Sequence, residues 1–535
     1  MVIGNSFGDI YIPGVNPLLL LTLGLVIVLG GILWLRLHPF LSLILGAFAV
    51  GGLTSTENIQ KSMAAKYEGD AFRKEVKTQV KRKISAEKEA GKDFDEAKIR
   101  EEVRSELKPR KADFEKNAKA KADEHAKQNT LQRITAAFGT TCEKIGILIA
   151  MACVIGRCML ASGAAERIVR GALSLVGIRR APVAFCASAF LLGIPVFFDS
   201  LFLLAIPIVK ATWLKVKKNY VLFVVALVAG GTMTHSLVPP TPGPLFVAEE
   251  LGVNLGTMIL TGIAIGLCCS TMGLLYAHWI NKRMDIPLRE TPEAMQKLEE
   301  LAGRDIKELP SLGLSLLPIL LPVVLISGVT IYKSGLDPTQ SVHSVLNLLG
   351  DKNIALTFAA AMAMLIAGMR LKDRQAVADH VQQGMMDGGL IILICCAGGA
   401  FGAMLQQSGI GPAITDMTEK QSIGPWLLPI AFVVTAVIRG AQGSATVAMF
   451  TAVAIVGPIA LDTDLDYHPV YLAVAIGCGS KPFPWMNDSG FWVISKMSGM
   501  TEKETLKALT PMATLMGLTG IIITMIAAKI FPMSN

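Results

Sequence analysis

The chain has 535 residues, of which 52% are hydrophobic and only 17% are charged. Several apolar runs approach the roughly 20 residues that a membrane-spanning helix needs. The composition therefore excludes a soluble globular protein and predicts an all-α polytopic membrane protein. The formal net charge of +8 comes mostly from one charged stretch and does not favour nucleic-acid binding. No cleavable signal peptide is evident, because no basic region precedes the first apolar run.

Residues 1–56 contain the first two predicted membrane helices, and residues 57–130 form a very different insertion. The helices cover Pro17–Leu35 and about Phe40–Leu53, with a basic turn at Arg36 between them. The insertion is dense in Lys, Glu and Ala, which predicts a soluble helical segment supported by opposite charges three or four residues apart. It has so few large apolar residues that we expect no core of its own. It is either a solvated extension or a regulatory or partner-binding arm.

Residues 131–281 complete the first half of the chain. After a third helix and an arginine-rich turn, an apolar segment at about 181–210 is interrupted by Gly193-Ile194-Pro195, with Asp199 just beyond. This pattern predicts a re-entrant helical hairpin. The next helix, within about 221–254, is broken by a proline-rich stretch, because each proline removes a backbone donor.

A polar loop, residues 282–310, precedes a second half, residues 311–535, with the same plan. Its hairpin covers about 426–460 and its broken helix about 469–492. The break at Gly479–Gly490 contains two prolines and an Asn-Asp-Ser sequence, whose side chains are costly in lipid. Irregular polar backbone at membrane depth is tolerated only where protein buries it or where it lines a wet cavity.

An internal repeat relates the two halves. A shift of 246 positions places Gly156 on Gly402, the first hairpin tip on the second, and Pro239–Gly243 on Trp485–Ser489 without a gap. Corresponding interruptions are typical of a transporter site at a repeat interface. If the short basic loops are cytoplasmic, the N-terminus and the insertion lie outside. Each half then has about five transmembrane helices plus a re-entrant hairpin and a broken helix, and the halves are inverted repeats.

The second hairpin tip and the second break supply the candidate substrate-binding residues. Half-helix N-termini present free N–H groups to an anion, and neutral side chains there would bind its hydroxyl groups. The predicted set is Arg439, Gln442, Gly443, Ser444, Thr446, Asn487, Asp488, Ser489 and, as the repeat counterpart of Asn487, Thr241. Arg439 either binds a substrate carboxylate or pairs with Asp199 or Asp488. The alternative for the whole set is that these side chains only satisfy the broken backbone.

Proton coupling requires a group whose protonation the site can control. Burial favours the neutral form of a carboxylate, and histidine titrates near neutrality, so the candidates are Asp199, Asp488 and His235. Asp199 is the first choice because it lies beside a hairpin tip, whereas a hydrogen-bonded structural role suits His235 better. No metal-binding motif and no phosphate-binding loop is present, so we expect no metal, no other cofactor and no direct ATP drive.

Four motifs resemble the gluconate permease family of proton symporters, within the ion transporter superfamily: Gly193–Asp199, Leu237–Pro244, Ala441–Ala448 and Asn487–Trp492. The resemblance covers nearly the whole chain except the insertion. It implies a multi-pass inner-membrane protein in the lipid bilayer that imports a small hydroxylated acid anion such as gluconate or glycerate with protons. Analogy with related carriers of the superfamily implies a homodimer. Members of the family often have His where Thr241 stands, which leaves the choice of substrate open.

Other functions remain as alternatives to a proton-coupled secondary transporter working by alternating access. The nearest is a sodium-coupled dicarboxylate or other organic-anion carrier of the same superfamily. A membrane enzyme would need a nucleophile and base or a metal cluster, and His235 has no Cys or His ligands near it in the sequence. An ion channel would show electrodiffusion rather than saturable turnover.

Overall fold

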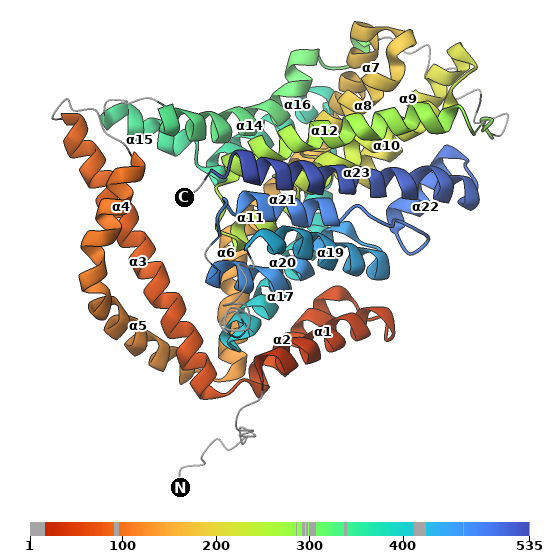
Figure 1. The fold of residues 1–535 in the computed structure, drawn as a ribbon. Helices are drawn as coiled ribbons and strands as arrows, with labels where there is room; N and C mark the ends of the chain where they lie inside the picture. Colours follow the sequence, from red (N-terminus) through yellow and green to blue (C-terminus); the bar gives the residue numbers. More distant parts are fainter. Residues whose placement is uncertain are drawn as a thin grey trace.

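The computed structural model describes residues 16–533, apart from 90–95, 285, most of 291–305, 336–339, most of 411–423 and 464. Within these residues every regular element is a helix (Figure 1). About half of the predicted 282–310 loop and the first fifteen residues therefore lie outside the described residues.

The first half contains nine helices besides the insertion, within the part of the chain described: α1 (Pro17–Leu33), α2 (Pro39–Leu53), α6 (Thr130–Ala161), α7 (Ala164–Val176), α8 (Ala181–Leu192), α9 (Phe198–Val216), α10 (Tyr220–Leu237), α11 (Pro242–Glu250) and α12 (Leu255–Asn281). Helix α6 begins well before the apolar run that predicted it, because Asn129 and Gln132 form a capping box that fixes its start. The arginine-rich segment expected as a turn is instead the amphipathic helix α7 followed by a short 3₁₀ turn, Ile178–Arg180.

The second half repeats many of these helix boundaries. Its described helices are α14 (Leu312–Gly335), α15 (Gln340–Leu349), α16 (Lys352–Leu371), α17 (Arg374–Gln407), α19 (Gly424–Gln442), α20 (Ala445–Asp462), α21 (Val470–Gly479), α22 (Ser489–Ser498) and α23 (Glu502–Ile530). Helices α6 and α17 end 246 residues apart, as do α9 and α20. The offset read from the sequence is thus also the offset between equivalent helix ends.

Seven of the described helical segments are long and apolar enough to cross a membrane, and two bent helix pairs raise the number to nine if each forms one span. Helices α8 and α21 are much shorter, with 12 and 10 residues. The long helices α6 and α17 pack along one another, and an ion pair joins Arg157 Nη2 to Asp387 Oδ2 at 2.7 Å.

The charged insertion is a helical arm made of α3 (Thr56–Glu89), α4 (Glu96–Leu107) and α5 (Lys111–Ala126). Figure 1 shows it beside the membrane helices, at the end of the bundle where the C-terminus lies. The expectation that it has no core is wrong, because apolar residues line up along its helices and pack in two small clusters that include Val80, Val103 and Leu107 in one and Met63 and Ala122 in the other.

The arm is anchored to the end of α17. Lys66 Nζ donates to Gln406 Oε1 at 2.8 Å, and Asn58 Nδ2 donates to the Ser408 carbonyl at 3.3 Å. From the start of α6, Arg133 donates to Gln407 Oε1 at 2.8 Å. The arm therefore connects α2 to α6. The corresponding connection in the second half, between α16 and α17, has only two residues.

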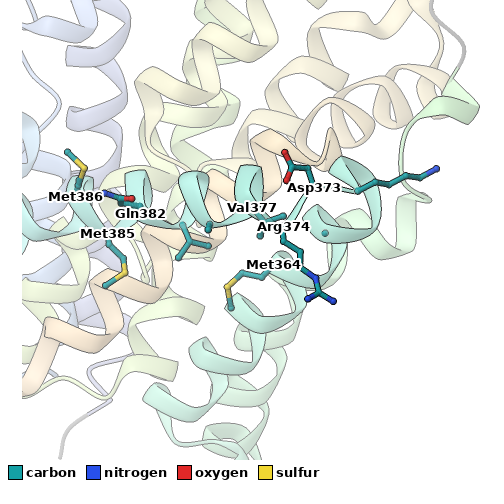
Figure 2. Close-up of a pocket in the computed structure, with 11 residues that line it drawn as sticks. Met364, Asp373, Arg374, Val377, Gln382, Met385 and Met386 are labelled. Atoms are coloured by element: carbon teal, nitrogen blue, oxygen red, sulfur yellow. The ribbon is translucent and has the colours of Figure 1, made fainter.

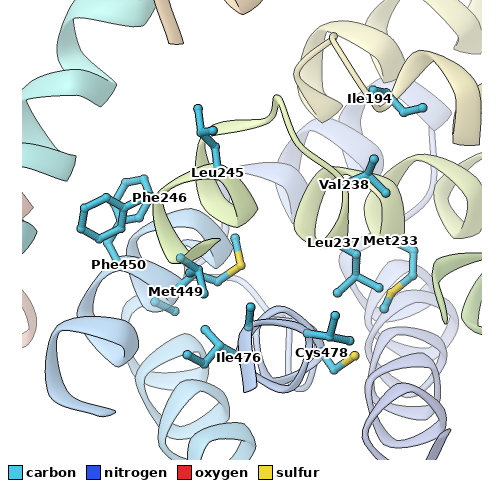
Figure 3. Packing of buried hydrophobic residues seen from close by; sticks show 14 of the residues in the cluster. Ile194, Met233, Leu237, Val238, Leu245, Phe246, Met449, Phe450, Ile476 and Cys478 are labelled. Carbon is cyan, nitrogen blue, oxygen red and sulfur yellow. The ribbon is translucent and has the colours of Figure 1, made fainter. Parts of the chain in front are cut away.

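The main core surrounds the crossing of α10, α11, α20 and α21. Figure 3 shows Phe246 of α11 beside Phe450 of α20, and their ring centroids are 5.0 Å apart. Leu237 and Cys478, on α10 and α21, are fully buried nearby. Glycine permits α10 and α21 to approach each other closely, because a Cβ on Gly477 would lie 2.6 Å from the Ser236 carbonyl oxygen. This packing brings the ends of broken helices from both halves together.

Candidate functional site

Two breaks from the second half meet at the candidate site. Helix α19 ends at Gln442 and α20 begins at Ala445, while the chain between α21 and α22 runs irregularly through Asn487. The Asn487 amide Nδ2 donates to the carbonyl oxygens of Gly440 and Ala441, at 2.9 and 3.2 Å. The hairpin tip and the broken helix, predicted to face the same region, are therefore in direct contact.

Arg439 joins these two breaks. Its side chain is 6% exposed, and its guanidinium forms an ion pair with Asp488 and donates to the Gly443 carbonyl. Its Nε donates to the Ser480 carbonyl at 3.1 Å. Of the two interpretations left open by the sequence, the structure shows the pairing with Asp488. The guanidinium neutralises a carboxylate and satisfies backbone carbonyls that regular helices would have paired.

Asp488 has a second role at the start of α22. Its Oδ1 accepts a hydrogen bond from the Gly490 backbone N–H at 2.9 Å, which caps the helix. Ser489, the first residue of α22, is exposed. Ser444 caps α20 in a similar way, accepting from the Val447 N–H at 3.3 Å. Two half-helix N-termini thus begin within this site.

Several polar atoms in the site have no hydrogen-bond partner among the described residues. Both amide atoms of Gln442 and the Oδ1 atom of Asn487 are buried and unpartnered. Buried polar groups are nearly always paired, so each exception requires an explanation. These atoms lie next to the first turn of α20, where Thr446 is half-buried and the helix dipole favours an anion. Together they could bind a ligand that carries both a carboxylate and hydroxyl groups.

The first half contributes a second carboxylate to this region. Asp199 lies in the first turn of α9 and is half-buried. A Cβ placed on Gly490 would lie 3.5 Å from Asp199 Oδ1 and 3.4 Å from Asp488 Oδ1. The two carboxylates therefore flank the same small glycine. Asp488 has Arg439 as its cation, whereas Asp199 has no ion-pair partner among the described residues.

Two predicted residues take no part in this hydrogen-bonded group. The Thr241 hydroxyl donates to the Val238 carbonyl at 2.6 Å, so it satisfies the first broken helix rather than the second. His235 faces Phe197, with ring centroids 6.1 Å apart, and its buried Nδ1 has no partner among the described residues. The hydrogen-bonded structural role expected for His235 is therefore not supported at Nδ1.

One residue missed by the sequence analysis is Lys481. Its side chain is 4% exposed, and its ammonium donates to the backbone carbonyl and the hydroxyl of Thr232, at 2.7 and 3.3 Å. The sequence could have indicated this residue, because a lysine within an interrupted membrane segment is costly and is usually functional.

A groove of about 890 Å³ lies elsewhere, between α16 and α17. Figure 2 shows Met364, Met385, Met386 and Arg374 around it. None of the predicted site residues lines this groove. Its lining combines methionines with Lys372, Asp373 and Arg374, and it is separate from the contact between the second hairpin tip and the second break.

Comparison with known proteins agrees with this arrangement. The model of the family described as GntP family permease matches residues 124–530. The chain belongs to the GntP permease family. The match begins near the end of the arm and includes both hairpins and both broken helices.

Three relatives are similar to this GntP permease over most of its length. It is 36% identical to an uncharacterized permease of Haemophilus influenzae over 73% of this chain and 82% of the relative. It is 32% identical to a gluconate permease of Pseudomonas aeruginosa (74% and 86% covered) and 31% identical to a D-serine transporter of Escherichia coli (70% and 83% covered). The chain is therefore a multi-pass membrane permease.

The fold also resembles a solved transporter. The YdaH transporter of Alcanivorax borkumensis aligns with a TM-score of 0.55 over 75% of this chain and 89% of its own, at 13% sequence identity. At that identity the likeness concerns the fold alone.

Proposed function

We propose that this GntP permease is a secondary active transporter that imports a small hydroxylated monocarboxylate, of the gluconate or glycerate class, together with protons. It resides in the inner membrane and works by alternating access between two inverted repeats. The equal offset of equivalent helix ends supports the repeats. The family membership supports transport, and the site chemistry supports the substrate class and the coupling ion.

The observation that carries the proposal is the pair of carboxylates beside Gly490. Two carboxylates that share a site favour the uptake of a proton, because like charges this close disfavour double ionisation. Arg439 already neutralises Asp488, so Asp199 is the group that takes up the proton. A proton on Asp199 removes a negative charge from the site, and the anionic substrate then binds without repulsion.

The substrate itself would lie at the start of α20. Its carboxylate accepts hydrogen bonds from backbone N–H groups of the first turn, around Thr446, where the helix dipole is positive. Its hydroxyl groups bind the amide atoms of Gln442 and Asn487 that have no other described partner. Proton and substrate thus occupy neighbouring positions, and each favours binding of the other.

The test is uptake by proteoliposomes containing the full chain. Labelled gluconate, glycerate, D-serine and a dicarboxylate are offered with an inward proton gradient and, separately, with a sodium gradient. We expect proton-driven accumulation of a hydroxylated monocarboxylate. Asp199→Asn is expected to lose accumulation, while Asp379→Asn, at an exposed site on α17, behaves as wild type. Accumulation of a dicarboxylate with sodium alone would contradict the proposal.

D-serine is the second candidate substrate, because a D-serine transporter is 31% identical to this chain. The amino group of D-serine would pair with the carboxylate of Asp199, which has no cationic partner among the described residues. In that case Asp199→Asn abolishes binding of D-serine itself, and not only its proton-driven accumulation.

A further inference from the structure

Lys481 is a buried cation that takes no part in the proton and substrate positions proposed above. It follows the C-terminus of α21, where Ser480 forms the cap. Among the described residues, its ammonium donates to Thr232 of α10, at the backbone carbonyl and the hydroxyl. No carboxylate of the described residues lies within ion-pair distance of it. Burying a charge without an ion-pair partner costs free energy, so other interactions at this position must stabilise the ammonium.

The side chain is held tightly in place. A Cβ on Gly517 of α23 would lie 3.2 Å from Lys481 Cβ and 2.8 Å from the Cys478 carbonyl oxygen. Ser480 Oγ donates to Ser236 Oγ at 3.1 Å, which ties the end of α21 to α10. The lysine therefore has little freedom to leave its position, and its ammonium marks a fixed point between helices of the two halves.

The surroundings of that point are those of a cation site. The C-terminus of a half-helix carries partial negative charge, and unwound carbonyls at such ends coordinate cations in transporters. The Thr232 carbonyl and hydroxyl are oxygen ligands, the type that hard metal cations prefer. Arg439, which is paired with Asp488, donates to the carbonyl of Ser480, the residue before Lys481. Because Arg439 is paired with Asp488, Lys481 is the cation here that has no carboxylate partner among the described residues.

We propose that the Lys481 ammonium is a tethered cation that fills an oxygen-lined position at the interface of the two halves, in place of a free alkali-metal ion. A carrier with this built-in charge binds its anionic substrate without Na⁺. This inference deepens the proposed function and relies on it only for the substrate. When Asp199 is protonated, the charge of Lys481 gives the site a net positive charge that matches one carboxylate.

Two substitutions at Lys481 separate charge from volume. Lys481→Ala removes the ammonium and leaves space next to Thr232, whereas Lys481→Met removes the charge and fills most of the space. The control is Lys496→Ala on α22, where the lysine side chain is 70% exposed. We expect both Lys481 variants to lose at least about tenfold in uptake rate without sodium, because charge-assisted hydrogen bonds are lost. Sodium is expected to restore part of the uptake in Lys481→Ala only.

A substrate-free measurement tests the same idea. The melting temperature of the purified full chain is followed as NaCl replaces choline chloride at constant ionic strength. A ligand that binds the folded state raises the melting temperature in a saturable way. We expect this rise for Lys481→Ala, and neither for wild type nor for Lys481→Met. No sodium effect on Lys481→Ala, or wild-type uptake by Lys481→Met, overturns the inference.

A milder variant keeps the test decisive if the Lys481 variants do not fold. Thr232→Val retains the lysine and removes one of its two acceptors, so the KM for substrate is expected to rise several-fold without any sodium dependence. An unchanged KM counts against the tethered cation. If the wild-type chain instead takes up no sugar acid, the proposed function fails, while the sodium titration still stands because it needs no substrate.

Discussion

The two hairpin tips have equivalent positions in the two halves and different chemistry. The first tip, Gly193–Phe197, is apolar, and its Ile194 and Val196 side chains are 3% and 1% exposed. The second tip, Arg439–Gly443, contains an arginine and a glutamine and contacts the polar break before α22. A shared backbone plan therefore carries two kinds of tip: the first packs against its neighbours, and the second presents polar groups.

This difference suggests how a repeat protein obtains an asymmetric site. The first half needs to supply only Asp199, one residue beyond the start of α9, because the second half already supplies the neutral hydrogen-bonding groups and Arg439. The predictions below test whether the polar groups of the second tip have the functional role that the first tip lacks.

The largest effect is expected from Arg439→Gln. This change leaves the Asp488 carboxylate without its cation and the Gly443 and Ser480 carbonyls without their donor. Removal of one partner of a buried ion pair costs about 3–5 kcal/mol, so we expect a strongly lowered melting temperature in detergent and no uptake.

A double variant provides the control for this prediction. Arg439→Gln combined with Asp488→Asn removes both charges, and its melting temperature is expected to lie above that of the Arg439→Gln single variant. If the double variant is as unstable as the sum of the two singles, the ion pair is not what joins the hairpin tip to the broken helix.

A smaller effect is expected where the second tip turns. Gly443 has φ of +90°, and a Cβ there would lie 2.2 Å from the Asn487 carbonyl oxygen. Backbone strain of this kind costs about 1–3 kcal/mol, so Gly443→Ala is expected to lower both the melting temperature and the uptake rate. Gly440→Ala is the matched control, since its Cβ would meet only Phe483 Cβ, at 3.7 Å. Equal effects of the two substitutions would contradict the close contact at the tip.

Much of this architecture could be predicted from the sequence. The apolar runs and their interruptions indicated the helices, and the gapless offset of 246 residues anticipated the equivalent ends of α6 and α17. The helix starts were less predictable, because α6 and α17 extend beyond their apolar runs into polar turns. The small core of the arm was not predicted because its few apolar residues are spread along the sequence. They form a cluster only where two helices pack together, as with Val80 and Val103.

The contact between the second hairpin tip and the second break was predictable, whereas the pairing of its side chains was not. The sequence placed Asn487 and Asp488 near the hairpin tip, because both lie at a break. It could not decide which carboxylate Arg439 neutralises, since that depends on how two breaks far apart in the chain approach each other. Lys481 was overlooked for the same reason: its partner, Thr232, lies 249 residues away in the chain.

The last comparison concerns Gln442, which stands where the first tip has Val196. Its two amide atoms are buried without a described partner, and such a group lowers stability by about 1–3 kcal/mol. Gln442→Leu is therefore expected to leave the melting temperature unchanged or raise it, while the KM for substrate rises about tenfold, the equivalent of one lost hydrogen bond of about 1.4 kcal/mol. Gln383→Leu, at an exposed position on α17, serves as the control. A lower melting temperature with an unchanged KM would instead show that Gln442 only supports the backbone at the tip, and the two hairpin tips would then differ in sequence without differing in function.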